Sequence, residues 1–408
     1  QTIKELAKDL IKQKSSSLVV SGSQDLNAQI LINAINFELG NFDNTVGLNT
    51  PLLNHQAIDE DMDQLIADLS TGQVKGLICY HSNPVFNHPE GDKIKKAIES
   101  LPFSLSIHES PNETSSLMQF VAADNHYLES WNDAEIKKGS FSLMQPAIHP
   151  LFDTRQFQAS LLKWSGQDVN YHKFIMKHWE ETLFTTQTLY TNFKSYWEHT
   201  LQEGIFQVKN TNKIKSEFTQ VNIKQAFNKL IQKSGSTNIE LQVYETVAIG
   251  NGSMGNNPWL QEMPDPISKI CWDNYLNISP KQAKEMGLET GNMVKLNNKL
   301  ELPVYILPGQ AYNSVSIAVG YGRELCGKVG KAVGFKISEY AHKEYTSVKL
   351  EKIEGHYDYA MTQTHHSMEG RAIVREANLD EYKKNPKAGN DNKQEYKNAG
   401  IYKEPEFP

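Results

Sequence analysis

Residues 308–335 have the sequence PGQAYNSVSIAVGYGRELCGKVGKAVGF. The segment opens on a Pro-Gly turn signal, because Pro fixes its own backbone angle and Gly can adopt a positive φ. Residues 315–319, VSIAV, then predict a largely buried strand. Glycines follow at positions 320, 322, 327, 330 and 334, a density that suits a backbone bending tightly or lying close to something large and flat. The function then depends on whether the rest of the chain builds a pocket in front of this segment, and on whether that pocket is filled.

Length and composition are those of a globular protein. The chain has 408 residues, of which 39% are hydrophobic and 22% are charged. That length allows two or three domains and buries roughly 75% of the extended-chain surface, so no disulfide framework is needed. The formal net charge is −7 and no Lys/Arg cluster interleaves with aromatic residues, which disfavours nucleic-acid binding. No apolar run approaches ~18 residues, so we expect no direct membrane span.

Cysteine usage argues against a metal centre built within this chain. Cys79, Cys271 and Cys326 lie far apart and no CxxC occurs, so neither a zinc site nor an iron–sulfur cluster is expected. The odd count also argues against a disulfide scaffold. The chain begins with Gln1, shows no signal peptide and ends in a polar tail. We interpret it as a fragment of a longer polypeptide.

The first 150 residues alternate between helical and strand patterns. Predicted helices cover residues 2–14, 25–37, 61–70 and 91–100, and predicted strands cover residues 17–22, 76–80 and 103–108. Gly40 is placed to end the second helix, and residues 121–128 form a last short strand or loop. Alternation of this kind predicts an α/β domain with a parallel, doubly wound, Rossmann-like sheet over residues 1–150.

Residues 151–236 predict a helical connecting region. An extended segment with two prolines, residues 139–150, precedes it. Predicted helices cover residues 154–164, 171–184, 186–199 and 223–233, with a polar surface excursion over residues 200–222. The large aromatic residues Trp164, Trp179, Phe184 and Trp197 fall on these helices, where we expect core and interface packing.

Residues 237–353 predict a compact β-barrel. Expected strands cover residues 239–244, 293–296, 302–307, 315–319 and 347–353. One short helix runs to residue 286, with Ser279 as its N-cap and Pro280 at its first position. Residues 354–408 are irregular and predict an extended linker.

Several segments together resemble the large subunits of the molybdopterin (bis-guanine-dinucleotide) oxidoreductases. They are NAIN at 33–36 with LGN at 39–41, NP at 83–84, ET at 113–114, HYLESW at 126–131, QP at 145–146 with PLFDTR at 150–155, NPWLQE at 257–262, PDP at 264–266, the turn at 287–292, and the opening segment. Their order covers residues 15–165 and 238–340. The resemblance implies that the barrel is a double-psi β-barrel similar to the family's dinucleotide-binding domain.

A narrower resemblance rests on NPWLQE at 257–262, VGYGR at 319–323 and THHSMEGR at 364–371. Together they resemble the large iron–sulfur subunit (B subunit) of bacterial alternative complex III, a respiratory quinol oxidoreductase. The resemblance implies a cofactor-less first domain and a ferredoxin-like domain whose iron–sulfur clusters lie in the continuation of the polypeptide. It implies cytochrome c-type and integral membrane quinol-binding subunits as partners. It also implies a peripheral place on the periplasmic face of the bacterial inner membrane.

Departures from the family pattern concern the cofactor. The family's ADVVLP appears as MQFVAA at 118–123, so Gln119 replaces an Asp and Ala123 a Pro, while Asn132 replaces the Gly of ESWGD. A bis-pterin needs close backbone approach and polar partners, which these changes weaken. We therefore expect no cofactor, no metal ligand and no catalytic residue within this chain. Candidates for the vestigial pocket are Gly22, Asn83, Gln119, Trp131, Tyr321 and Arg323.

Two pairs of histidines each allow a functional and a structural interpretation. His365 and His366 could ligate a metal or haem, or form a docking loop. Docking is favoured because neighbouring residues of an extended chain point to opposite faces. His81 and His88 flank the NP loop, where they could serve a proton path or be satisfied loop histidines.

Two further sets of candidates are also open. Tyr321 and Arg323 could contact a phosphate or a pterin edge. In an empty barrel, Arg323 would instead pair with a carboxylate, either Glu324 or one nearer in space. Glu109 and Glu113 are close in sequence, but no partner acid for catalysis can be named.

Three functions remain, and the first is favoured. The chain is a cofactor-less scaffold in a respiratory complex, with the helices over 154–200 and the 354–408 tail as docking surfaces. Alternatively it belongs to an active molybdenum oxidoreductase acting on a small oxyanion or sulfur compound. A free-standing binding module is the third.

Overall fold

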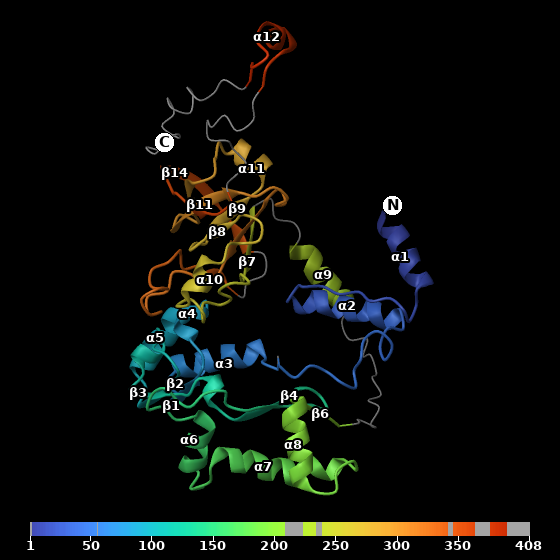
Figure 1. The fold of residues 1–408 in the computed structure, drawn as a ribbon, viewed down its shortest axis with the longest axis vertical. Coiled ribbons are helices and arrows are strands. Elements are labelled where there is room, and N and C mark those ends of the chain that lie inside the picture. The colour runs from blue at the N-terminus through green and yellow to red at the C-terminus, as the bar shows by residue number, and fades with distance from the viewer. Residues whose placement is uncertain are drawn as a thin grey trace. The chain divides into compact units, whose positions relative to one another are not determined.

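The computed structural model describes residues 2–54, 56–208, 223–233, 239–341, 346–363 and 376–389. The chain divides into a large unit, Gln1–Glu262 with Trp272–Asp358, and a small unit, Met263–Cys271 with Tyr359–Pro408 (Figure 1). Among the residues so described, no helix combines the length and apolar character needed to span a bilayer.

A parallel sheet forms the α/β part of the large unit (Figure 1). Its strands are β1 (Gly76–Tyr80), β2 (Phe103–His108) and β3 (Phe120–Ala123), paired in that order. Helices α3 (Asp59–Ser70), α4 (Pro84–Asn87) and α5 (Gly91–Glu99) supply a buried core that includes Ile66, Ile94 and Ile98. On α6 (Phe157–Trp164), Phe157 stacks on Tyr80 of β1 with ring centroids 4.3 Å apart. The predicted parallel α/β arrangement is therefore confirmed for these strands.

The strand predicted at residues 17–22 is wrong. This segment lies between α1 (Thr2–Lys12) and α2 (Leu26–Glu38) and is extended, but it joins no strand among the described residues. Leu18 and Val20 are 50% and 76% exposed. The backbone N–H of Val19 donates to Oδ1 of Asn36 at 3.0 Å, and Nδ2 of Asn36 donates to the carbonyl of Val19 at 2.7 Å. The Asn36 side chain thus makes the hydrogen bonds that a neighbouring strand would make. The helix predicted at residues 25–37 is confirmed as α2. Asp25 caps it, and Gly40, with φ +66°, follows its end.

Helices and a small antiparallel sheet form the connecting region. The sheet orders β4 (Asn132–Lys137), β5 (Ser140–Met144) and β6 (Ile205–Gln207), and the helices are α6, α7 (Tyr171–Thr182), α8 (Phe193–Glu203) and α9 (Ile223–Lys233). Trp179 and Trp197 are buried in an aromatic cluster, as predicted, whereas Trp164 is half exposed. The helix predicted from residue 186 begins later, at Phe193. Before it, Gln187 accepts a hydrogen bond from the Tyr190 amide in a loop, and the Asn192 side chain caps the helix by accepting from the Ser195 amide.

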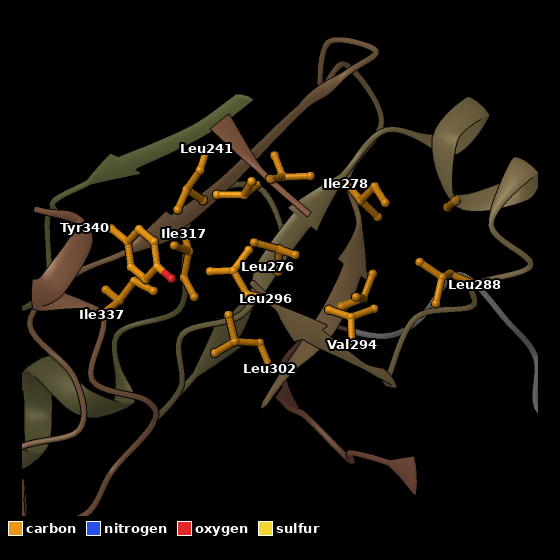
Figure 2. Packing of buried hydrophobic residues seen from close by; sticks show 14 residues of the cluster. Leu241, Leu276, Ile278, Leu288, Val294, Leu296, Leu302, Ile317, Ile337 and Tyr340 are labelled. Atoms are coloured by element: carbon orange, nitrogen blue, oxygen red, sulfur yellow. The ribbon is translucent and has the colours of Figure 1, made fainter. Parts of the chain in front are cut away.

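Seven strands form a curled, half-barrel sheet in the rest of the large unit. Their order is β13 (Thr346–Val348), β7 (Ile239–Tyr244), β12 (Ser314–Ala318), β9 (Leu276–Ile278), β11 (Leu300–Ile306), β10 (Asn292–Leu296) and β14 (Leu350–His356). Figure 2 shows Leu276, Leu296, Leu302 and Ile317 packed together inside this sheet. The strands predicted at 239–244, 293–296, 302–307 and 315–319 are confirmed, whereas the single strand predicted at 347–353 is two strands, β13 and β14, at opposite ends of the sheet. Closure into a double-psi barrel remains a prediction.

Short elements complete the chain. Helix α11 (Pro280–Glu285) begins as predicted, with Ser279 accepting a hydrogen bond from the Gln282 amide at 3.3 Å. Helix α10 (Pro258–Glu262) also belongs to the large unit. In the small unit, β8 (Ile270–Cys271) pairs with β15 (Ala360–Met361), and α12 (Leu379–Lys384) carries a capping box. His365 and His366, with their THHSMEGR motif, lie outside the described residues.

Asp273 gives the half-barrel a pH-dependent stability. Its carboxylate accepts a hydrogen bond from the Tyr357 hydroxyl at 2.7 Å, and burial raises the pKa of Asp273 to about 6. Because this pKa is raised on folding, the protonated form favours the folded state, and stability falls as the pH rises from about 4 through 6. We expect Asp273→Asn to gain about 1 kcal/mol over the wild type between pH 4 and 8, allowing for solvent screening.

Urea unfolding at pH 4.5 and pH 8 measures this difference. Tyr357→Phe is the companion variant. The Tyr357 hydroxyl lowers the pKa of Asp273, so its removal should steepen the pH dependence of stability. An Asp273→Asn advantage of equal size at both pH values would contradict the assignment.

Candidate functional site

A cavity of about 820 Å³ lies at the carboxyl ends of the parallel strands β1 and β2. Ligands of parallel α/β sheets commonly bind at this edge. Polar loops after the two strands supply His81, Asn83, His108 and Asn112, and the half-barrel supplies Arg323. Apolar side chains of α3, β1 and α5 line another part of its wall. The cavity therefore joins the two parts of the chain that the sequence singled out.

Arg323 forms a buried ion pair with Glu113. Their side chains are 6% and 10% exposed, and Nη2 of Arg323 lies 2.8 Å from Oε2 of Glu113. Nε of Arg323 also donates to both carboxylate oxygens, at 2.9 and 3.0 Å. The predicted alternative of a carboxylate partner for Arg323 is thus the one observed, and the partner is Glu113 rather than the adjacent Glu324.

The Glu113 carboxylate is bonded from several other sides. It accepts hydrogen bonds from the backbone amides of Glu324 (2.9 Å) and Leu325 (3.1 Å) and from Nδ2 of Asn83 (2.7 Å). Burial alone would raise the pKa of Glu113, but the hydrogen bonds from Arg323, Leu325 and Asn83 outweigh it and lower the pKa to about 2. Glu113 therefore stays ionised at every physiological pH.

Each nitrogen of the Arg323 guanidinium has a partner within the protein. Nη1 donates to the carbonyl of Gly252 at 2.6 Å and Nη2 to the carbonyl of Leu325 at 3.0 Å, while the guanidinium lies 4.8 Å from the ring centre of Phe86. A phosphate could bind Arg323 only by displacing Glu113. The anion site offered by this loop is thus filled by the chain's own carboxylate.

Asn83 organises the loop that carries Glu113. Its Oδ1 accepts hydrogen bonds from the backbone amide and the hydroxyl of Thr114, at 3.0 and 2.8 Å, while its Nδ2 donates to Glu113. The NP and ET motifs are therefore one hydrogen-bonded unit. The sequence made Asn83 a pocket candidate but did not show that the two motifs contact each other.

Histidines and an aspartate meet at the ends of the three strands. His81 Nε2 donates to Oδ2 of Asp124 at 2.8 Å, and the rings of His81 and His108 stack with centroids 5.0 Å apart. The hydrogen bond to Asp124 raises the pKa of His81, whereas burial lowers the pKa of His108. His81 also has φ +45°, an uncommon conformation for a residue with a side chain. His88 lines the same cavity.

A second cavity of about 850 Å³ lies in the large unit. Gly22, Glu245 and Gly320 line it, together with Asp59 at the start of α3. Its described lining contains two acidic side chains and neither Lys nor Arg. A nucleotide phosphate would find no positive partner there.

The six predicted pocket residues divide among different places. Gly22 lines the second cavity, and Asn83 and Arg323 line the first. The other three line neither described cavity. Tyr321 is buried beside Ile249, Gln119 donates to the carbonyl of Leu101, and Trp131 stacks on His172 with centroids 3.7 Å apart. The sequence therefore did not separate structural positions from cavity positions.

Glycines of residues 308–335 pack against other backbone segments of the chain. A Cβ on Gly320 would lie 2.5 Å from the carbonyl oxygen of Gly250, and one on Gly322 would lie 2.2 Å from the amide nitrogen of Lys336. Such distances leave no room for a side chain. These glycines are therefore required where turns of the half-barrel pack backbone against backbone.

The described residues do not fit the dinucleotide cofactor that the resemblance implies. Its phosphates need cations or free amides, but Glu113 occupies both the guanidinium of Arg323 and the amides beside it. The second cavity adds only the negative charges of Asp59 and Glu245. Within the described ranges, no group of three or more His, Cys, Asp or Glu side chains is arranged to hold a metal ion.

Comparisons with known proteins show similarities in sequence and in structure. No protein-family model matches this chain. Over 183 residues it is 25% identical to the menaquinone reductase, molybdopterin-binding-like subunit, of Nitratidesulfovibrio vulgaris, an alignment that covers 40% of this chain and 26% of that protein. The chain thus matches about a quarter of that relative's length. The solved structure of acetylene hydratase from Pelobacter acetylenicus is similar with a TM-score of 0.46 and 12% identity, over 67% of this chain and 42% of that one.

Proposed function

We propose that this chain is the cofactor-less scaffold region of a subunit in a membrane-bound respiratory complex. The observation that carries the proposal is the Glu113 carboxylate seated on Arg323 and on two backbone amides. This contact neutralises the positive site that a cofactor phosphate would use. It also ties the half-barrel to the loop after β2 through a buried ion pair.

Similarity to a subunit named for menaquinone reductase and for a molybdopterin-binding-like character supports the respiratory setting. Within it, we assign the chain to the large iron–sulfur subunit of an alternative complex III, which passes electrons from quinol to cytochrome c or an oxidase. The motifs at 257–262 and 319–323 support this finer assignment. The chain would hold a ferredoxin-like domain carrying iron–sulfur clusters in the continuation of the polypeptide.

The partners in this proposal are cytochrome c-type and integral membrane quinol-binding subunits on the periplasmic face of the inner membrane. Exposed apolar side chains support a docking role for the region between β3 and β6. They include Leu151, Phe152, Trp164 and Leu189, of which Leu189 is 86% exposed. A partner covering these side chains would remove apolar surface from water.

Metal and pterin analysis of the full-length protein, purified from its native membranes, tests the proposal. We expect iron from the clusters, but neither molybdenum nor released pterin in stoichiometric amount. Stoichiometric molybdenum and pterin would overturn the scaffold assignment in favour of an active oxidoreductase for a small oxyanion or sulfur compound. Recovery as a monomer free of respiratory subunits would instead favour a free-standing binding module.

A further inference from the structure

The chain passes between the large unit and the small unit at three points, after Glu262, before Trp272 and after Asp358. On the large-unit side the first two crossings are tied by their backbones, because the Trp272 amide donates to the carbonyl of Gln261 at 3.0 Å. The third crossing follows the end of β14. What holds this third crossing to the second therefore decides how firmly the connection is closed.

A side-chain hydrogen bond joins the second crossing to the third. The Tyr357 hydroxyl donates to Oδ1 of Asp273 at 2.7 Å, and both residues are half-buried. Asp273 directly follows Trp272, and Tyr357 is the last residue but one before the third crossing. Tyr357 is itself fixed to the half-barrel, since its amide donates to the carbonyl of Gly291 at 2.8 Å. The bond thus lies where both segments leave the large unit.

The backbone around the second crossing is strained. Trp272 has φ +66° and Lys269 has φ +63°, which is the left-handed region that residues with large side chains rarely adopt. Such conformations persist only where the surrounding contacts hold them. Opening of the crossing therefore relieves strain, and the Asp273–Tyr357 bond is one of the contacts that oppose it.

Ionisation of Asp273 favours opening. Burial raises the pKa of Asp273 to about 6 and outweighs the Tyr357 hydroxyl, which acts in the opposite direction. Below this pH the carboxyl group is neutral, and its burial costs little. Above it, the carboxylate gains hydration when the two segments part, because a buried charge is poorly solvated.

Other charged groups adjoin the bond on neighbouring segments. They are Glu289, Lys336, His356 and Asp358. His356 and Asp358 pair with each other, with Nε2 and Oδ1 3.3 Å apart. Burial and the Tyr357 hydroxyl are the causes of the raised Asp273 pKa, so these four groups do not set it. Histidine ordinarily changes charge in the same pH range, which makes His356 the neighbour to be separated from Asp273 by experiment.

We propose that the Asp273–Tyr357 pair is a pH-sensitive latch on the connection between the two units. When Asp273 is protonated, the latch holds the second and third crossings together. When Asp273 is ionised, the two segments part more often. The latch acts by local opening and is therefore distinct from the effect of Asp273 on global stability. It requires no cofactor and stands whether or not the complex is correctly assigned.

Amide exchange of the 408-residue chain, labelled with ¹⁵N-tryptophan, tests the latch by nuclear magnetic resonance. The Trp272 amide can exchange only when its bond to Gln261 opens, and Trp272→Phe assigns its signal among those of the six tryptophans. We expect its protection to fall about tenfold between pH 4.5 and 7.5, after correction for the intrinsic exchange rate. The direction follows from a pKa that is higher in the closed than in the open form. A fall of less than about twofold would overturn the proposal.

Urea separates local opening from unfolding of the whole protein. Local opening exposes little surface, so low urea concentrations should leave exchange of the Trp272 amide unchanged at pH 7.5. An exchange rate that rises with urea as steeply as the global unfolding constant would mean that the crossing opens only on unfolding. That result would refute the latch.

Two variants assign the pH response to its group. Asp273→Asn can still accept the Tyr357 hydroxyl but carries no charge, so protection of the Trp272 amide should stay constant from pH 4.5 to 7.5. His356→Gln, next to Tyr357 on the third crossing, is the matched control and should keep the full fall. Persistence of the fall in Asp273→Asn, or its disappearance in His356→Gln, would contradict the assignment to Asp273.

Discussion

Replacing Glu113 with Gln is expected to destabilise the protein by about 3 kcal/mol, since the change leaves the buried guanidinium of Arg323 without its countercharge. Gln can keep some of the hydrogen bonds to Asn83 and Leu325, so the loss reports mainly on the charge. Urea unfolding at pH 7 measures it. Glu109→Gln is the matched control, because Glu109 lies on the same loop but is exposed, and its loss should stay within about 0.5 kcal/mol.

Acid titration gives the same ion pair a second signature. The pKa of Glu113 is lowered on folding to about 2, so its contribution is complete above pH 4.5 and disappears as the pH falls towards 2. Glu113→Gln should therefore lose less stability than the wild type over this acid range. The double variant Glu113→Gln/Arg323→Met should recover part of the loss at pH 7, because no unpaired charge remains buried. Equal losses for Glu113→Gln and Glu109→Gln would contradict the ion-pair assignment.

Gly322→Ala is expected to destabilise the half-barrel by about 3 kcal/mol or more, combining backbone strain with overpacking. Gly322 has φ +73°, and an added Cβ would lie 2.2 Å from the amide nitrogen of Lys336. The Cβ is fixed to its own Cα and the Lys336 nitrogen is a backbone atom, so neither can move aside as the end of a flexible side chain would. Gly287→Ala is the matched control, since Gly287 has φ +62° but no atom within 4 Å of the added Cβ. It should lose only the strain of about 1–2 kcal/mol.

Thermal and urea unfolding of these two variants separate strain from crowding. A Gly322→Ala loss no greater than that of Gly287→Ala would mean that the segment has room for side chains. That result would reopen the interpretation of the glycine-rich segment as a ligand-facing wall.

Local signals in the sequence predicted most of the elements. The strand at 76–80 carries a continuous apolar run, the strand at 103–108 alternates apolar and polar residues, and the Ser-Pro pair at 279–280 marks the start of α11. The segment at 17–22 has the same apolar signal, yet its backbone bonds Asn36 instead of a strand. An apolar run shows that a strand is possible, but the existence of a partner strand is a property of the whole chain.

Prediction of the site from the sequence was partial for a similar reason. Arg323 was a candidate and a carboxylate partner was one of its two interpretations. However, Glu113 lies 210 positions away, and no local pattern connects the two. His108 and Asp124 were not singled out, although His108 ends a predicted strand and Asp124 falls in the segment predicted as a last short strand or loop. In the structure both stand where side chains of neighbouring parallel strands converge. Asn112, whose Nδ2 is buried without a partner among the described residues, gave no sequence signal, because an orphaned donor can be recognised only from its surroundings.

The 210-position separation between Glu113 and Arg323 also bears on how the chain folds. Contacts of such long range close large loops and tend to form after local structure. We therefore expect Arg323 to stay hydrated while the half-barrel assembles, and to meet its countercharge only when the loop carrying Glu113 is in place. Stabilisation gained after the folding barrier slows unfolding and leaves the folding rate unchanged. The ion pair thus sets how long the assembled protein persists, rather than how quickly it is made.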